Sequence, residues 1–371
     1  MARAPLDLLC ATLARVPQVR LVGEACTFES ARDVSELTVQ IARRTYLLTL
    51  GHAQSGQPRE IRSSVHALQS LKSPSTGHRV NVLVAPYLSP AARRICEESD
   101  VSYFDLEGNV RLVFGTVYIE RQVTGEPKPV RRELQSIFKP RSAQVLKVML
   151  SQPERSWKIV ELARAARVSL GHASNVRVAL IGREWATVTD QGLVLSDPDA
   201  LLDAWGQNYQ PPAGEQLGFY TTLHGSAFEQ AARSALMAQD GQGFAIFASF
   251  SASNWMAPFA RTGKQYFYAD QAGLDRLKSS LALSSASKGD NVVIVLVKDT
   301  GLFHDTVQPV PGVFCTSPVQ TYLDMAAAGE RGREAADHLR RERLKWKNVH
   351  GANPSPHRTT TTGQPPQSKR S

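Results

Sequence analysis

Short apolar runs alternate with helical patterns in the first part of the chain. Apolar residues at helical spacing predict one helix up to about Arg20 and another over Ile61–Leu71. The predicted strands are Leu37–Ile41, Tyr46–Leu50, Val80–Ala85, Val101–Phe104, Val110–Phe114 and Val117–Ile119. Ser89 and Pro90 predict the start of a further helix, as N-cap and first-turn residue. Strands and helices that alternate in this way predict a layered α/β domain over residues 1–125.

A different pattern fills residues 141–206, where helix, helix, turn, helix and hairpin follow one another. The first two helices are predicted over Ser142–Leu150 and Trp157–Ala166, and Ser169 is the predicted N-cap of the third. The predicted hairpin strands are Trp185–Val188 and Leu193–Ser196. This is the order of a winged helix-turn-helix, whose third helix enters the major groove of DNA and presents its N-terminal residues to the bases.

Residues 217–344 predict a third unit, again α/β. Its predicted helices are Leu223–Leu236, Pro318–Met325 and Arg331–Leu344, with Ser317 as a cap. Its predicted strands are Phe244–Phe250, Tyr266–Tyr268 and Val292–Val297. The last of these has no polar position, which predicts a strand buried on both faces. The tail, residues 345–371, is polar and free of acids, so we expect disorder there.

Charge adds a candidate partner to this picture. The net charge is +9 and the pI about 9.5, which favours a polyanion such as DNA. Basic residues gather in the predicted linker, residues 126–140, and just beyond it. The predicted phosphate-binding residues there are Arg131, Arg132, Lys139 and Arg141. No apolar run is long enough for a membrane span and no signal peptide is recognisable, so we expect a cytoplasmic protein without a membrane partner.

The predicted third helix supplies candidate base contacts. The predicted DNA-binding residues are Ser169, Gly171, His172, Ser174, Asn175 and Arg177. An asparagine can pair with adenine, and an arginine can bind guanine or a phosphate. The hairpin turn carries Asp190, which repels phosphate, so we expect the wing to graze the DNA. The same fold used for protein contacts is the alternative to a role on double-stranded DNA.

Catalytic and metal-binding patterns are weaker. Asp105 and Glu107 follow a predicted strand and could hold Mg²⁺, but an Asp/Asn turn with Gly108 explains them more simply. An active nuclease also needs an acid and a lysine two residues apart, where Thr49 and Gly51 stand. The four scattered cysteines form no CxxC pair, which argues against a zinc site or a disulfide framework. We therefore expect no metal, no cofactor and no enzymatic activity.

Motifs of known catalytic classes are also missing from the sequence. It contains no HExxH, GxSxG or GxxxxGK[ST] pattern. His224-Gly225-Ser226 is similar to the opening of a nucleotidyltransferase site, but the following predicted strand, GFAIFASF, lacks the paired acids such a site needs. The start of a helix is the simpler role for Gly225 and Ser226.

Three stretches of sequence resemble one family. They are SYFDLEGNVRL; SLGHASNVRVAL with LSDPDALLDAW; and ASFSASNWMAPFAR with GDNVVIVLV and CTSPVQTYLDMAAAGERGREAADHLR. Together they resemble the AbiEi-type antitoxins of type IV toxin–antitoxin systems, in a larger variant described as transcriptional regulators. The resemblance implies a degenerate, inactive restriction-endonuclease-like N-terminal domain, a winged helix-turn-helix and an AbiEi-type C-terminal domain.

The resemblance also implies a function. Such a protein represses its own promoter and counters a nucleotidyltransferase-like toxin, without a need for direct contact between the two. Two alternatives stay open from the sequence: a divalent-metal nuclease that uses Asp105 and Glu107, and a protein-interaction module in which residues 217–344 neutralise a toxin.

Overall fold

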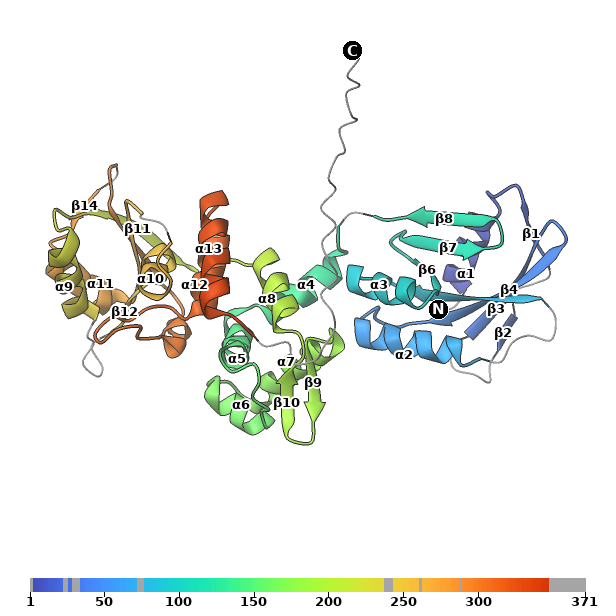
Figure 1. The fold of residues 1–371 in the computed structure, drawn as a ribbon, viewed down its shortest axis with the longest axis horizontal. Coiled ribbons are helices and arrows are strands. Elements are labelled where there is room, and N and C mark those ends of the chain that lie inside the picture. Colours follow the sequence, from blue (N-terminus) through green and yellow to red (C-terminus); the bar gives the residue numbers. More distant parts are fainter. Residues whose placement is uncertain are drawn as a thin grey trace, which may run out of the picture.

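The computed structural model describes residues 3–22, 26–28, 34–71, 77–123, 125–236, 243–259, 262–286 and 288–346. Three units follow one another along the chain, and Figure 1 shows the middle one lying between the other two. We call them the N-terminal unit (residues 3–123), the central unit (125–207) and the C-terminal unit (214–346). Strands and helices mix in the first and the third, so the fold is α/β, as the sequence pattern predicts. Within the described ranges, no helix is long and apolar enough to cross a membrane.

The N-terminal unit is a curled mixed sheet with helices on both faces. Its helices are α1 (Arg3–Leu13), α2 (Pro58–Gln69) and α3 (Pro90–Glu98). Its strands are β1 (Val19–Leu21), β2 (Cys26–Phe28), β3 (Val34–Ile41), β4 (Arg44–His52), β5 (His78–Ala85), β6 (Ser102–Asp105), β7 (Val110–Phe114) and β8 (Val117–Arg121). The order is β1-β3-β4-β5-β6-β7-β8, with β2 beside β3. The strands β4, β5 and β6 run parallel, and the other neighbours are antiparallel.

Alternation along β5 distributes side chains to the two faces of this sheet. Val82 and Val84 pack in a cluster with Leu9 of α1, whereas Leu83 packs in a second cluster with Ile61 of α2. Successive side chains of a strand point to opposite faces, and here both faces are covered by a helix. Both faces of β5 are buried in its second half. This explains why VNVLVA has no alternating polar positions after Asn81.

The central unit has the element order that the sequence predicts. Its helices are α4 (Lys128–Ile137), α5 (Pro140–Ser151), α6 (Ile159–Ala165), α7 (Leu170–Gly182) and α8 (Pro198–Gln207), and its hairpin strands are β9 (Ala186–Thr189) and β10 (Gly192–Leu195). The basic linker thus contains a helix, α4. Trp157 was expected in the second helix but lies before it, because it exchanges backbone hydrogen bonds of 2.8 and 2.9 Å with Leu193. This bridge ties the chain before α6 to the hairpin at a single residue.

The C-terminal unit wraps helices around a second mixed sheet. Its strands are β11 (Gly214–Tyr220), β12 (Ala245–Phe247), β13 (Gln265–Ala269), β14 (Ser284–Ser285) and β15 (Val292–Val297). Its helices are α9 (Gly225–Leu236), α10 (Ser249–Met256), α11 (Gln271–Ser280), η1 (Thr300–Asp305, a 3-10 helix), α12 (Pro318–Ala326) and α13 (Glu330–Arg343). The described strands lie in the order β12-β13-β15-β11-β14. The apolar strand β15 is therefore interior to the sheet, which agrees with the prediction that it is buried.

One sequence prediction in this unit is wrong over half its length. The strand expected over Phe244–Phe250 ends at Phe247, and α10 begins at Ser249. Ser249 has a φ of 48°, which breaks the extended conformation at that point. The strands β11 and β14 and the helices α11 and η1 were also not predicted, because none carries a strong local pattern. The tail beyond Trp346, for which we expect disorder, lies outside the described residues.

The central and C-terminal units share one hydrophobic core. A single cluster of buried side chains runs from Ile137 of α4 through Leu146 of α5 to Leu339 of α13. In the N-terminal unit the buried side chains form separate clusters on the two faces of its sheet. The helix α5 is packed against η1 and α12, so the C-terminal unit directly fixes the first helix of the central one.

Candidate nucleic-acid interface

The turn before α7 is fixed by local hydrogen bonds. Arg167 takes a left-handed φ of 53°, and the Val168 amide donates to the Ala163 carbonyl at 3.0 Å. Ser169 then caps the helix, since its Oγ accepts from the His172 amide at 3.2 Å. The predicted N-cap is confirmed. This cap satisfies one of the free amides of the first turn and sets where α7 begins.

One face of α7 is buried and the opposite face is open. Ala173, Val176 and Leu180 are buried at helical spacing, and the last two join the core cluster that contains Leu162 of α6. On the far side, Val178 is 66% exposed. A Cβ built on Gly171 or on Gly182 would meet no heavy atom within 4 Å. The positions of Gly171, Val178 and Gly182 are therefore open, as a helix that enters a DNA groove requires, although the helix α2 of the N-terminal unit also contacts α7.

The predicted contact residues divide between the open face and its flanks. Gly171 and Asn175 are exposed on the open face. Ser174 and Arg177 are half-buried beside it. His172 is also half-buried, with its Nε2 3.1 Å from the Ser142 hydroxyl of α5. The imidazole of His172 therefore ties α7 to α5 and orients the helix.

A cationic groove lies beside the His172 flank of α7. It has a volume of about 1020 Å³. The basic side chains and histidines that line it are Lys139, Arg141, Arg167, His172, Lys298 and His304, and the acid among the described lining residues is Asp299. Burial, and then the nearby Arg167 guanidinium, lower the pKa of His304. A groove of this sign favours a phosphate backbone.

Two of these lining residues, Lys298 and His304, come from the C-terminal unit and were not predicted from the sequence. Lys298 precedes η1 and His304 lies within it, more than 100 positions from α7 in the chain. The hydrophobic core shared by α5 and the C-terminal unit brings them to the groove. No local signal in the sequence marks this pairing, because it depends on packing between two units.

The other predicted basic residues lie outside this groove. Arg131 and Arg132 are exposed on α4, one helix before Lys139. Their neighbour Glu133 accepts a hydrogen bond from Arg183, at the end of α7, at 3.0 Å. At the wing, Asp190 is exposed in the β9–β10 turn, as expected.

The acidic turn of the N-terminal unit has the structure of a backbone-binding turn. Asp105 is fully buried, and its Oδ1 accepts from the amides of Glu107, Gly108 and Asn109 at 2.9–3.1 Å. Its Oδ2 accepts from the Leu88 amide and from the Asn109 side chain. Gly108 has the positive φ, 104°, that the turn interpretation predicts. Within the described parts of the chain, no group of three His, Cys, Asp or Glu side chains could hold a metal ion.

The Gly225-Ser226 pair lies at the start of α9, and Gly225 has a φ of 57°. The prediction of a helix start is confirmed there. The paired acids of a nucleotidyltransferase site are absent from the neighbouring strand β12, whose sequence is AIF.

Comparison with protein families gives a match over part of the chain. Residues 194–345 match the family model described as "Transcriptional regulator, AbiEi antitoxin, Type IV TA system". This part of the chain is similar to the AbiEi family. The matched AbiEi segment begins in β10 and includes α8 and the C-terminal unit. The helices α5, α6 and α7 lie outside it, so their role is argued from geometry.

Other comparisons are less informative. One solved structure, "Structure of EndoMS in apo form", is similar at 18% identity and a TM-score of 0.19. The similarity covers 28% of this chain and 45% of that one, so the chain spans less than half the length of that protein. At this TM-score the likeness supports no argument about fold or activity. Curated proteins give no match.

Proposed function

We propose that this AbiEi-family chain is a DNA-binding transcriptional regulator whose residues 141–206 act as a winged helix-turn-helix. The observation that carries the proposal is the open face of α7, beside a groove lined by Lys139, Arg141 and Arg167. A free helix face with cations on its flank is the arrangement that major-groove readers use. The family description, a transcriptional regulator, points to the same class of function.

In this proposal the residues of α7 have distinct tasks. Asn175 reads a base, because it is exposed near the N-terminus of α7 and can pair with adenine N6 and N7. Gly171 has no side chain, so the helix can approach the base edges closely. Arg177, on the flank, reaches a guanine or a phosphate. His172 and Ser169 position the helix, through Ser142 and through the cap.

The basic residues contact phosphates. Lys139 and Arg141 line the groove next to α7, and we assign to them the phosphates of the strand beside the recognition helix. Arg131 and Arg132 are exposed on α4 and add attraction that is independent of sequence. The domain division proposed for this architecture is 1–125, 126–140, 141–206, 217–344 and 345–371.

We further propose that the DNA target is the protein's own promoter, in a type IV toxin–antitoxin pair with a nucleotidyltransferase-like toxin. This rests on the family description of the C-terminal match. The N-terminal unit is then a restriction-endonuclease-like domain without cleavage activity, because Thr49 and Gly51 occupy the positions where an acid and a lysine are needed. A cytoplasmic location follows from this role.

DNA affinity measured by fluorescence anisotropy tests the proposal. The full-length chain is titrated onto its upstream promoter fragment and onto a scrambled duplex, at several salt concentrations. We expect preference for the promoter and a log affinity that falls linearly with log salt. Asn175→Ala and Arg177→Ala should each weaken promoter binding by about 1–3 kcal/mol and reduce the preference for the correct bases.

Arg331→Ala serves as the matched control, because Arg331 is an exposed arginine at the start of α13 and should leave binding unchanged. Wild-type affinity in both α7 variants would overturn the assignment of the recognition helix. Equal affinity for promoter and scrambled DNA would overturn sequence-specific regulation.

Growth rescue tests the antitoxin role. The toxin encoded beside the gene is expressed with the wild-type chain or with a chain that carries both Asn175→Ala and Arg177→Ala, because deletion of the central unit would remove part of the shared core. Rescue by the wild type alone ties protection to DNA binding, whereas rescue by both chains assigns protection to another part of the protein.

A further inference from the structure

A cavity of about 300 Å³ lies where the central and C-terminal units meet. Its walls come from the start of α5, from the segment that joins α8 to β11, and from η1. The apolar lining residues are Phe138, Ala143, Trp205, Pro211, Pro212 and Leu302. This size and this lining are typical of pockets for small molecules, and the volume is too small for a helix of a protein partner.

A stack of aromatic rings makes one wall rigid. The Phe138 ring lies between two tryptophans, with its centroid 5.7 Å from Trp205 and 6.4 Å from Trp185. The Phe138 and Trp205 planes are 8° apart, so the two rings are stacked. Trp205 is 2% exposed and belongs to the shared core. Because these side chains are packed on several sides, the wall keeps its shape when the cavity is empty.

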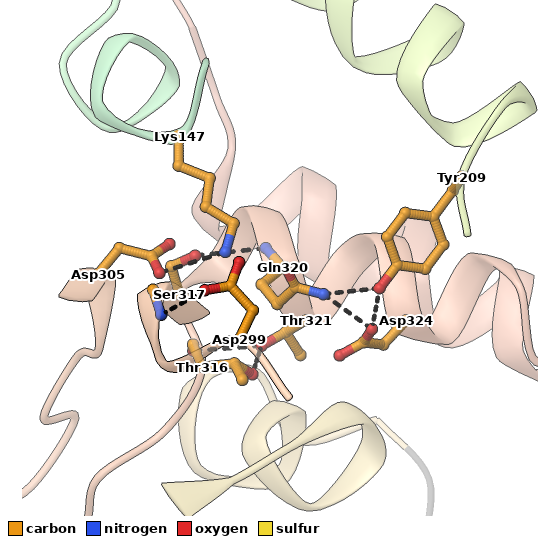
Figure 2. Close-up of polar contacts among 10 residues, drawn as sticks. Lys147, Tyr209, Asp299, Asp305, Thr316, Ser317, Gln320, Thr321 and Asp324 are labelled. Atoms are coloured by element: carbon orange, nitrogen blue, oxygen red, sulfur yellow. Dashed lines mark hydrogen bonds and ion pairs between the residues drawn. The ribbon is translucent and has the colours of Figure 1, made fainter. Parts of the chain in front are cut away.

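The opposite end of the cavity is polar. Figure 2 shows Lys147 descending from α5 toward Asp305, with Gln320 between Lys147 and Tyr209. Lys147, Gln320 and Tyr209 all line the cavity. The amide Nε2 of Gln320 donates to Tyr209 at 2.6 Å and to Asp324 at 2.9 Å. Both of its N–H groups are therefore used, which fixes the orientation of this end.

The Lys147 ammonium has N–H donors that are not used in hydrogen bonds within the described residues. Its side chain is 6% exposed, and its Nζ is 3.3 Å from Asp305 Oδ1. An ammonium group carries three N–H donors, and this contact is the one hydrogen bond the group makes within the described residues. Burying an ammonium group whose N–H donors lack acceptors costs free energy. An acceptor from a bound molecule would supply a further hydrogen bond to Lys147.

Charges at the mouth of the cavity are compatible with an anion. Lys139 is exposed there, and the acid at the mouth, Asp299, uses Oδ1 to accept from the Gly301 amide at 2.9 Å. Gln144 adds an amide that can donate. The mouth therefore presents a cationic and a neutral donor beside the Asp299 carboxylate.

We propose that this cavity is a binding site for a small aromatic carboxylate. The ring lies along the wall of Phe138, Trp205 and Pro211, and the carboxylate accepts hydrogen bonds from the Lys147 ammonium. The site is distinct from the DNA-reading face of α7 and does not depend on it. It joins the two units, since Lys147 comes from α5 and Leu302 from η1.

Calorimetric titration of the full-length protein tests this site, with naphthoate as the probe and the uncharged naphthamide as its isosteric partner. We expect saturable binding of naphthoate with one molecule per chain and weaker binding of naphthamide. Lys147→Gln keeps a polar side chain but removes the ammonium, and should weaken naphthoate binding at least about tenfold, as the loss of a charge-assisted hydrogen bond does. The control Lys128→Gln changes an exposed lysine of α4 and should bind like wild type.

A second variant keeps the test independent of the buried charge. Ala143→Phe places a ring in the cavity and should abolish binding, while an unchanged far-UV circular dichroism spectrum shows that the helices remain. Absence of naphthoate binding to the wild type at concentrations up to about 1 mM, the weak end of specific binding, overturns the proposal. Wild-type affinity in the Ala143→Phe or Lys147→Gln chain, or equal affinity for naphthoate and naphthamide, also overturns it.

Discussion

Arg62 of α2 and Glu184, just after α7, form a two-pronged ion pair that joins the N-terminal unit to the candidate recognition helix. Arg62 Nε lies 2.9 Å from Glu184 Oε1, and its second guanidinium nitrogen lies 3.0 Å from Oε2. The pair is partly open to solvent, with the Arg62 side chain 60% exposed. It lies just beyond the C-terminal end of α7, at the opposite end of the helix from Gly171.

Breaking this pair should have a small effect on stability. Exposed ion pairs contribute about 0–1 kcal/mol, so a double-mutant cycle of Arg62→Gln and Glu184→Gln should give a coupling energy in that range. The coupling should fall at high salt. Urea unfolding of the four chains measures it. A coupling of several kcal/mol would contradict the exposed geometry.

A charge placed on the open face of α7 should block DNA binding without harming the fold. Gly171→Glu adds a carboxylate where nothing lies within 4 Å, so the melting temperature should stay close to that of wild type. Promoter affinity should fall by more than about 100-fold, because an acid at the reading end of the helix repels phosphate and blocks close approach.

Gly182→Glu is the matched control for this change. Gly182 is equally open but lies at the other end of α7. Anisotropy titrations should show a much smaller loss for this variant. Equal losses in the two variants would mean that the N-terminal end of α7 has no special role.

Asp105 should prove to be a stability residue. Asp105→Ala would leave several amides of the turn without acceptors, and each unsatisfied buried amide costs about 1–3 kcal/mol. The free energy of unfolding should drop by several kcal/mol, whereas Glu107→Ala, at an exposed position, should change it by less than about 0.5 kcal/mol. Plasmid DNA incubated with the wild type and Mg²⁺ or Mn²⁺ should stay intact. Nicking by the wild type that disappears in the Glu107→Ala chain, whose stability should be nearly unchanged, would instead support the nuclease alternative.

Asp324 should give stability a measurable pH dependence. Burial raises the pKa of this carboxyl from 3.8 to about 6, and hydrogen bonds from Tyr209, Tyr268 and Gln320 offset part of the rise. Because the folded-state pKa is the higher one, this group's contribution is fully present below about pH 4 and is lost as the pH rises toward 6. Asp324→Asn cannot ionise. Its stability relative to wild type should therefore rise across this window by an amount on the order of 3 kcal/mol and stay constant above it.

Chemical unfolding of both chains from pH 4 to 8 measures this difference. Asp337→Asn changes an exposed aspartate of α13 and should give a difference that is flat with pH. A flat difference for Asp324→Asn as well would show that the buried carboxyl titrates as in water.

The local pattern was sufficient for most elements of the N-terminal and central units. Ser89 and Ser169 cap the helices they were predicted to cap, and Asp105 binds the backbone of its own turn. These features depend on neighbours a few positions away, so periodicity and capping chemistry reveal them. Prediction was poorer in the C-terminal unit, where α10 follows β12 with no change in the apolar pattern to mark the switch.

The sequence by itself determined where α7 begins, which of its residues could read DNA, and that the basic residues gather before it. Tertiary structure decided that Lys298 and His304 line the groove beside α7, and that Lys147, Gln320 and Tyr209 meet at the polar end of one cavity. Helix caps and side-chain periodicity depend on residues within one or two helical turns, so residues close together in the sequence predict them. The groove and the cavity form between segments more than 50 positions apart, and they exist because burial of one shared apolar core holds those segments together.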